Sequence, residues 1–111
     1  MTIRSMKAYE MHADFCKLFS NPIRLALLDV FREGDKTVTQ LQKLLHISQS
    51  TVSQHLAMLR RLGMVKTHKE GRKVYYGISD ERLLKAYDLV DQIVRERRTA
   101  EAKILQAYTP Q

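Results

Sequence analysis

The fold of this chain is decided by the stretch Ile47-Ser48-Gln49-Ser50-Thr51-Val52-Ser53-Gln54-His55-Leu56-Ala57-Met58-Leu59-Arg60-Arg61-Leu62-Gly63. Ser48 supplies a side-chain oxygen that can cap the start of a helix, and Gly63 can adopt the left-handed backbone that ends one. Between these caps, Val52, Leu56 and Leu59 recur at the spacing that aligns side chains on one helix face. The stretch therefore predicts one helix of about four turns whose apolar face enters a core.

The opposite face of this predicted helix is polar. Its amino end carries short side chains without fixed charge, which can donate and accept hydrogen bonds at base edges in a DNA major groove. Arg60 and Arg61 follow near the carboxyl end, where they complement the helix dipole. No acidic residue occurs between Leu44 and Lys69. The uncharged polar residues of the amino end are Gln49, Ser50, Ser53 and Gln54.

A shorter amphipathic helix is predicted just upstream, over Val38–Leu45, with Thr39 as its cap. Only His46 and Ile47 separate it from Ser48. Two short helices joined this tightly must cross rather than run antiparallel, which is the helix-turn-helix arrangement whose second helix enters DNA. The residues expected to face inward are Leu41, Leu44 and Leu45.

The region that follows has the character of a β-hairpin. β-Branched and aromatic residues partly alternate over 64–69 and 73–79, and Gly71 can supply the positive φ of the turn between them. The strand residues Val74, Tyr76 and Ile78 are expected to share one face. Two strands with no further sheet would hold a basic tip out toward DNA phosphates or a minor groove. The basic residues of this tip are Lys69, Arg72 and Lys73.

In these features the sequence resembles the ArsR family of small bacterial and archaeal winged-helix repressors. The similarity runs from Thr37 to Leu62, continues through Gly63-Met64-Val65 and Glu70-Gly71-Arg72-Lys73-Val74-Tyr75-Tyr76, and extends over most of the chain. The resemblance implies a mainly α fold with a small β-hairpin, a winged helix-turn-helix. It also implies a dimer formed through the first and last helices. The residues closest to the family signature are Ser48-Gln49-Ser50-Thr51-Val52-Ser53, His55, Leu56 and Leu59.

Length and charge fit this interpretation. At 111 residues the chain is expected to form one domain, residues 1–111, with the helix-turn-helix at about 38–62 and the wing at about 64–79. The net charge is +7, and seven basic residues between Lys43 and Tyr76 stand against Glu70 alone, so this segment carries +6 of it. An excess confined to one motif indicates a polyanionic partner. No apolar run is long enough for a membrane span and no secretory signal is present, so we expect a cytoplasmic protein.

Two flanking helices are expected to join two copies of the chain. The first, at about 5–19, is apolar around more than half of its circumference and ends where Ser20-Asn21-Pro22 starts a helix running to about Arg32. The last, at about 80–108, is capped by Asp80 and could exceed about 35 Å in length. Its apolar seam needs a partner, for which we expect the first helix of a second copy of the chain. Because such a homodimer would carry two recognition helices related by a two-fold axis, we expect an inverted-repeat operator. The seam residues are Leu83, Leu84, Tyr87, Val90, Ile93 and Val94.

Members of the resembled family commonly bind a metal, but the matching positions here are not metal ligands. The family's Cys-x-Cys site falls on Thr37 and Thr39, which have no thiolate. Its alternative site on the last helix falls on Asp80, Arg82, Ile93 and Glu96, where an arginine and an isoleucine replace imidazoles. We therefore expect neither a metal nor another cofactor.

His12 and Cys16 are four residues apart on one helix face, but zinc needs three or four ligands and no third lies nearby in sequence. A lone cysteine among apolar neighbours is usually a buried small hydrophobe. One cysteine per chain excludes an intramolecular disulfide, whereas an intersubunit one stays open. A thiol-responsive repressor using Cys16 is one alternative, and an unknown small-molecule or redox effector stays open with it.

The sequence predicts a regulator rather than an enzyme, because Thr51 and His55 lack a third orienting group and an oxyanion donor. We expect a homodimeric, sequence-specific repressor of double-stranded DNA. The competing hypothesis is a winged helix that docks on another protein and does not bind DNA. Bases would be read by Gln49, Ser50, Ser53 and Gln54, supported by Thr51 and His55. Phosphates would be neutralised by Lys69, Arg72, Lys73, Arg60 and Arg61.

Overall fold

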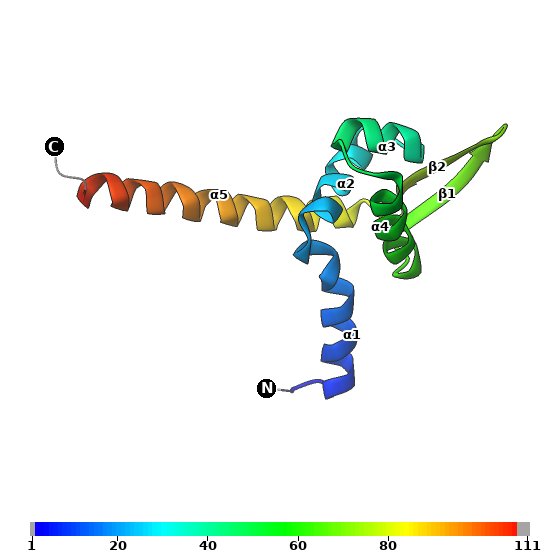
Figure 1. Cartoon of the computed structure of the whole chain (residues 1–111). Coiled ribbons are helices and arrows are strands. Elements are labelled where there is room, and N and C mark those ends of the chain that lie inside the picture. Colours follow the sequence, from blue (N-terminus) through cyan, green and yellow to red (C-terminus); the bar gives the residue numbers. More distant parts are fainter. Residues whose placement is uncertain (1, 109–111) are drawn as a thin grey trace.

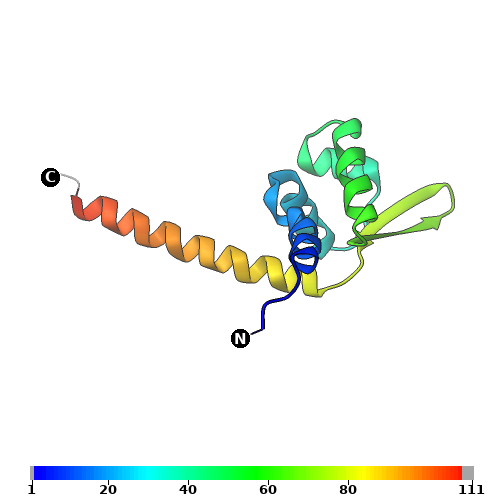
Figure 2. The same cartoon turned by 90° about the horizontal axis from the view of Figure 1, so that it is seen from below.

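The computed structural model describes residues 2–108, and its helices and hairpin follow the predicted order (Figure 1). The helix-turn-helix and the hairpin form a body, from which the first helix and most of the last helix project in different directions (Figures 1 and 2). The elements are α1 (Met6–Cys16), the 3₁₀ helix η1 (Lys17–Ser20), α2 (Pro22–Arg32), α3 (Val38–Leu45), α4 (Gln49–Arg61), β1 (Val65–Glu70), β2 (Lys73–Ile78) and α5 (Arg82–Tyr108).

Helix α4 forms as its sequence predicts. The Ser48 Oγ accepts a hydrogen bond from the Thr51 N–H at 3.1 Å, which satisfies a backbone donor in the first turn. At the other end Gly63 has φ 75°, the left-handed conformation that ends a helix. The predicted inward residues Val52, Leu56 and Leu59 are all buried. The helix is thus defined by its own caps and by its apolar face.

Helix α3 corrects two sequence-based predictions. Its cap is Thr37, not Thr39: the Thr37 hydroxyl accepts from the Gln40 N–H at 3.2 Å, and the Gln40 side chain accepts from the Thr37 N–H at 2.9 Å. Leu44 does not face inward, because its side chain is 50% exposed. The core contacts come instead from Leu41 and Leu45, which are one turn apart. His46, with φ 55°, turns the chain after α3 so that α4 crosses the side of α3 that carries these two leucines.

Replacing Thr37 by alanine should destabilise the fold, whereas replacing Thr39 should not. The Thr37→Ala change removes an N-cap and half of a capping box, which typically costs about 1 kcal/mol of unfolding free energy. Thr39→Ala is the matched control because Thr39 lies inside α3, exposed, and we expect a change within about 0.5 kcal/mol. Urea unfolding of both variants measures the difference. Equal losses would contradict the assignment of the cap.

The hairpin pairs in register from Val65–Ile78 to Glu70–Lys73, and Gly71 in its turn has φ 62°, as expected. The sequence predicted no further sheet, and this was incomplete. Lys36, just before α3, exchanges two backbone hydrogen bonds with Tyr76, of 2.9 and 2.8 Å, and so forms an isolated bridge at the free edge of β2. Pairing between residues this far apart in sequence leaves no local signal.

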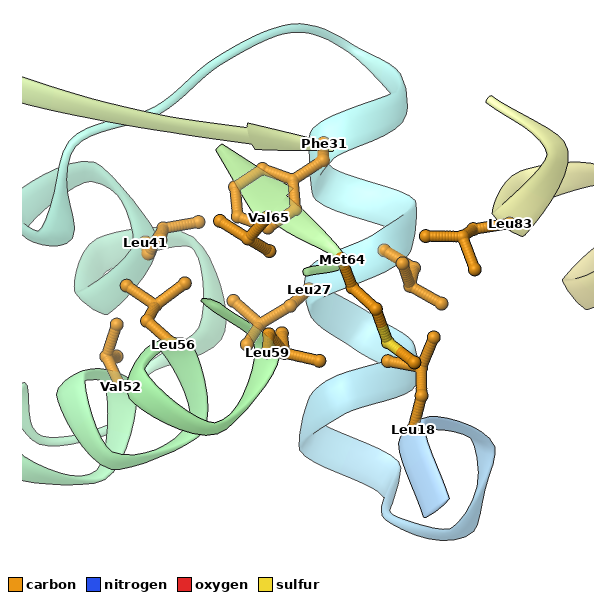
Figure 3. Packing of buried hydrophobic residues seen from close by; sticks show 11 residues of the cluster. Leu18, Leu27, Phe31, Leu41, Val52, Leu56, Leu59, Met64, Val65 and Leu83 are labelled. Atoms are coloured by element: carbon orange, nitrogen blue, oxygen red, sulfur yellow. The ribbon is translucent and has the colours of Figure 1, made fainter. Parts of the chain in front are cut away.

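The core lies where α2, α3, α4, the base of the hairpin and the start of α5 meet (Figure 3). Of the apolar residues of α2, Leu27, Leu28 and Phe31 are buried, whereas Ile23 and Val30 are only partly covered. Arg24 was not predicted to be inside, yet it is 8% exposed and donates to the Lys17 carbonyl at 2.7 Å. The cluster consists of Leu18, Leu27, Leu28, Phe31, Leu41, Val52, Leu56, Leu59, Met64, Val65 and Leu83.

The first predicted helix is divided in two, because α1 ends at Cys16 and the chain continues as η1 before Asn21 caps α2. Helix α1 has no buried residue at all. Helix α5 begins as predicted, with the Asp80 carboxylate accepting the Arg82 N–H at 2.9 Å. No helix between residues 2 and 108 combines the length and the apolar character that a membrane span requires.

Two contacts anchor the start of α5 to the body. The Arg32 guanidinium donates to both carboxylate oxygens of Asp88, at 3.1 and 2.8 Å, and the Tyr87 hydroxyl donates to Asp29 at 3.0 Å. Immediately before α5, the Ser79 Oγ donates to the Gly63 carbonyl at 2.6 Å, and the Ser79 N–H donates to Met64 at 3.0 Å. The end of α4, the start of β1 and the entry to α5 therefore meet at one hydrogen-bonded junction.

Candidate nucleic-acid interface

The polar face of α4 is presented to solvent. Gln49, Ser50, Ser53 and Gln54 are all exposed, and Ser50 and Gln54 lie on the side of the helix away from Val52, Leu56 and Leu59. Thr51 is half-buried, and its hydroxyl accepts a hydrogen bond from the Ser48 Oγ at 2.8 Å. The four exposed side chains thus form a surface of hydrogen-bonding groups without charge, while Thr51 stabilises the first turn that carries them.

Arg60 and Arg61 extend this surface toward the hairpin. Together with Ser53 and Ala57 of α4 they line an open hollow of about 360 Å³ whose other wall is Tyr76 of β2. A positively charged end of the helix therefore lies against the base of the wing. Both arginines are exposed, so their guanidinium groups are accessible to an anion.

The tip of the wing faces the start of α3 across a second hollow of about 510 Å³. Arg72 and Lys73 line it on the wing side, and Tyr76 belongs to both hollows, so the two are adjacent. Lys69 is also exposed on β1. The α3 residues that line this hollow were not predicted as part of the surface: Thr37, Val38, Thr39, Gln40 and Lys43. Their polar character was visible in the sequence, but their position opposite the wing depends on the tertiary fold.

The structure separates His55 from the wing side of α4. His55 and Arg60 are five residues apart, which is about 140° around a helix, so they lie on different flanks. Partial burial lowers the pKa of His55, because it disfavours the charged imidazolium, and the nearby Arg24 charge lowers it further. His55 is therefore a neutral, half-buried group beside α2 near neutral pH. A contact between His55 and DNA stays a prediction.

Several of the positions that match the family's metal ligands are engaged in other interactions. Thr37 takes part in the capping box of α3. The Arg82 guanidinium lies 2.7 Å from Asp80, and hydrogen bonds from the Arg82 side chain and N–H lower the pKa of Asp80 to about 2. Within residues 2–108, no cluster of three or more His, Cys, Asp and Glu side chains is arranged to hold a metal ion.

Cys16 is exposed in the single chain, which corrects the expectation that it is a buried small hydrophobe. It lines an open hollow of about 580 Å³ on α1, together with Arg4, Tyr9 and His12. His12 and Cys16 do share one side of the helix, as their spacing predicts. A response of the Cys16 thiol to oxidation stays a prediction.

Comparison with known proteins shows which regulators this chain is similar to. The family model described as "Bacterial regulatory protein, arsR family" matches residues 21–67. A helix-turn-helix transcriptional regulator of Methanocaldococcus jannaschii is 37% identical over 89 residues, covering 79% of this chain and 100% of the relative. The transcriptional activator HlyU of Vibrio cholerae is 36% identical over 77 residues, covering 69% of this chain and 71% of HlyU.

Solved structures show the same architecture. NolR from Sinorhizobium fredii superposes with a TM-score of 0.73 at 30% identity, covering 84% of this chain and 96% of NolR. A homodimeric winged helix-turn-helix DNA-binding domain from Mycobacterium bovis gives a TM-score of 0.73 at 26% identity, covering 86% of this chain and 92% of that domain. The order of helices and hairpin described above is therefore the one found in winged helix-turn-helix regulators.

Proposed function

This chain belongs to the ArsR family of regulatory proteins and is a DNA-binding transcriptional regulator, and we propose that it acts as a homodimeric repressor at an inverted-repeat operator. The observation that carries the proposal is the juxtaposition on one side of the body of the uncharged polar face of α4 and the basic wing. Uncharged hydrogen-bonding groups suit base edges, and positive charges suit phosphates. The protein would act in the cytoplasm, with the DNA it regulates.

We assign different roles to the two parts of this surface. The exposed side chains at the start of α4 would read bases in the major groove, because the amino end of a recognition helix is the part that reaches base edges. The arginines at its end and the wing would neutralise phosphates. Base readout is assigned to Gln49, Ser50, Ser53 and Gln54 with support from Thr51 and His55, and phosphate contact to Arg60, Arg61, Lys69, Arg72 and Lys73.

Homodimer formation through α1 and α5 is supported by the apolar surface that these helices leave uncovered. Helix α1 has no buried residue in the single chain, and α5 exposes Leu89, Val90, Ile93 and Val94 beyond the body. Exposed apolar patches of this kind mark protein interfaces. A two-fold dimer would present two copies of α4 to half-sites about 34 Å apart, one turn of DNA.

Ser53→Ala and Gln54→Ala should reduce discrimination between operator and random DNA. Each removes hydrogen bonds to base edges, which are worth about 1–3 kcal/mol, so the ratio of the two affinities should fall about 10- to 100-fold. The salt dependence should not change, since no charge is lost. Fluorescence anisotropy titrations with both duplexes measure these quantities. Gln92→Ala on α5 is the control, and an equal effect there would contradict the assignment.

The function as a whole is tested with duplexes from the region upstream of the chain's own gene. We expect a retarded complex whose formation resists competition by random DNA, and a reporter gene behind that region should be silenced by the protein. Retardation without preference for any sequence, together with capture of a specific protein partner, would favour the competing interaction module. Increased reporter expression would establish an activator instead.

A further inference from the structure

The loop between α2 and α3 holds the wing on two sides. At the edge of β2, the Lys36 backbone pairs with Tyr76. On the outer face of the hairpin, the carboxylate of the preceding residue, Asp35, lies over Gly77, and its Oδ2 is 3.3 Å from the His68 Nδ1. Lys36 thus holds β2 through its backbone. The side chain of Asp35 contacts both strands, at Gly77 of β2 and at His68 of β1.

His68 is held at more than one point. Its ring stacks on that of Tyr75, the residue opposite it in the hairpin, with centroids 5.3 Å apart and planes inclined by 12°. Its Nε2 lies 3.4 Å from the Glu70 carboxylate, so each ring nitrogen faces a different acid. The His68 side chain is 43% exposed, but its position is fixed by three neighbours, Asp35, Glu70 and Tyr75. This arrangement orients His68 toward Asp35.

Gly77 provides the space for the Asp35 carboxylate. A Cβ added at Gly77 would overlap the Asp35 side chain, so no other residue fits there without displacing it. The conformation of Gly77 is not the reason for glycine, because its φ is not among the positive values found in the described chain. Glycine in a strand commonly marks such a close approach. The contact therefore depends both on the Asp35 carboxylate and on the absence of a side chain at Gly77.

We infer that Asp35, His68 and Gly77 form a latch that sets the angle of the wing, so that Arg72 and Lys73 meet DNA phosphates. Asp35 and His68 are positioning residues in this inference, which rests on the proposed phosphate contacts of the wing tip. Lys73 is four residues along β2 from Gly77, about 13 Å. A rotation of about 10° at the latch would move the tip by about 2 Å, enough to break a charge-assisted hydrogen bond.

The latch and simple electrostatics predict opposite effects when Asp35 is removed. Deleting a negative charge near a DNA-binding surface should strengthen binding, because repulsion from phosphates is reduced. Loss of the latch should weaken binding, because the wing tip no longer holds its contacts. The sign of the effect therefore decides between them.

The experiment compares Asp35→Ala with Glu33→Ala, which removes the same charge from an exposed residue two positions upstream. Operator affinity is measured by anisotropy over a range of salt concentrations. We expect about 10-fold weaker binding and a shallower salt dependence for Asp35→Ala. Glu33→Ala should bind as well as the wild type or better. Asp35→Asn, which keeps the shape of the latch residue, should retain the wild-type salt dependence.

Coupling to the wing tip separates positioning from general destabilisation. In an Arg72→Ala/Lys73→Ala background, Asp35→Ala should weaken binding no further, because the contacts it positions are already absent. Backbone order parameters from NMR relaxation should fall for residues 69–73 in Asp35→Ala and stay unchanged in Glu33→Ala.

Three results would overturn the latch: unchanged order parameters, a salt dependence equal to that of Glu33→Ala, or an undiminished loss in the tip-deficient background. If Arg72→Ala/Lys73→Ala itself leaves the salt dependence unchanged, the phosphate role of the wing fails. The order parameters then still test whether Asp35 restrains the hairpin. Failure of the latch and failure of the proposed function are thus distinguishable.

Discussion

Replacing Ile93 by lysine is expected to raise the dimer dissociation constant at least about 100-fold, equivalent to roughly 2.7 kcal/mol. Ile93 is 52% exposed in the single chain and lies outside the buried cluster. The fold of each subunit should therefore survive the change. In the proposed dimer the same position is covered by the partner, where an unpaired ammonium group is costly to desolvate.

Operator affinity should fall with dimer stability, because a single subunit can engage only one half-site and loses the advantage of linked binding. Sedimentation velocity gives the dissociation constant, circular dichroism checks the fold, and anisotropy gives the operator affinity. Gln92→Lys is the matched control, since it adds the same charge next in sequence but about 100° around the helix, on an exposed polar position. A monomeric Gln92→Lys, or a fully dimeric Ile93→Lys, would contradict the proposed interface.

The double substitution Arg72→Ala/Lys73→Ala is expected to weaken binding to operator and random DNA alike, by about 100-fold or more at physiological salt. Each lost phosphate contact reduces the slope of log affinity against log salt by about 0.9, so loss of both contacts in two subunits should reduce it by about 3 to 4. The ratio of specific to non-specific affinity should change little, because phosphates carry no sequence information. This outcome differs from the one expected for Ser53→Ala and Gln54→Ala.

Loss of positive charge anywhere could weaken DNA binding slightly, and this requires a control. Lys85→Ala/Lys103→Ala removes the same net charge from exposed positions on α5. We expect its salt slope to stay close to that of the wild type. If both double variants lose the same slope, net charge rather than the wing accounts for the effect, and the wing contributes no defined phosphate contact.

Helix α4 could be predicted from sequence because everything that defines it is local. Ser48 and Gly63 act on the residues next to them, and Val52, Leu56 and Leu59 are aligned by helical geometry alone. The hairpin was predictable for a similar reason, since Gly71 fixes the turn and hence the register. The candidate surface on α4 follows from the same periodicity, because the side opposite the core must be exposed.

Other features depend on neighbours that sequence does not reveal. Thr37 and Thr39 are both good caps, and the reciprocal bond to Gln40 selects the first. Leu44 has the same hydrophobicity as Leu41, and only the direction of α4 decides which is covered. The contact between Asp35 and His68 joins residues 33 positions apart, and neither is unusual where it stands in the chain. The approach of α3 to the wing tip has the same origin.

The junction at Ser79 has a consequence for operator geometry. Ser79 links the end of α4 to the chain that enters α5, because it donates hydrogen bonds to the carbonyls of Gly63 and Met64. In a symmetric pair of subunits, the crossing angle of the two α5 helices would then set the distance between the two α4 helices. A change of a few degrees in that angle would shift the two α4 helices relative to each other without any change within α4 itself.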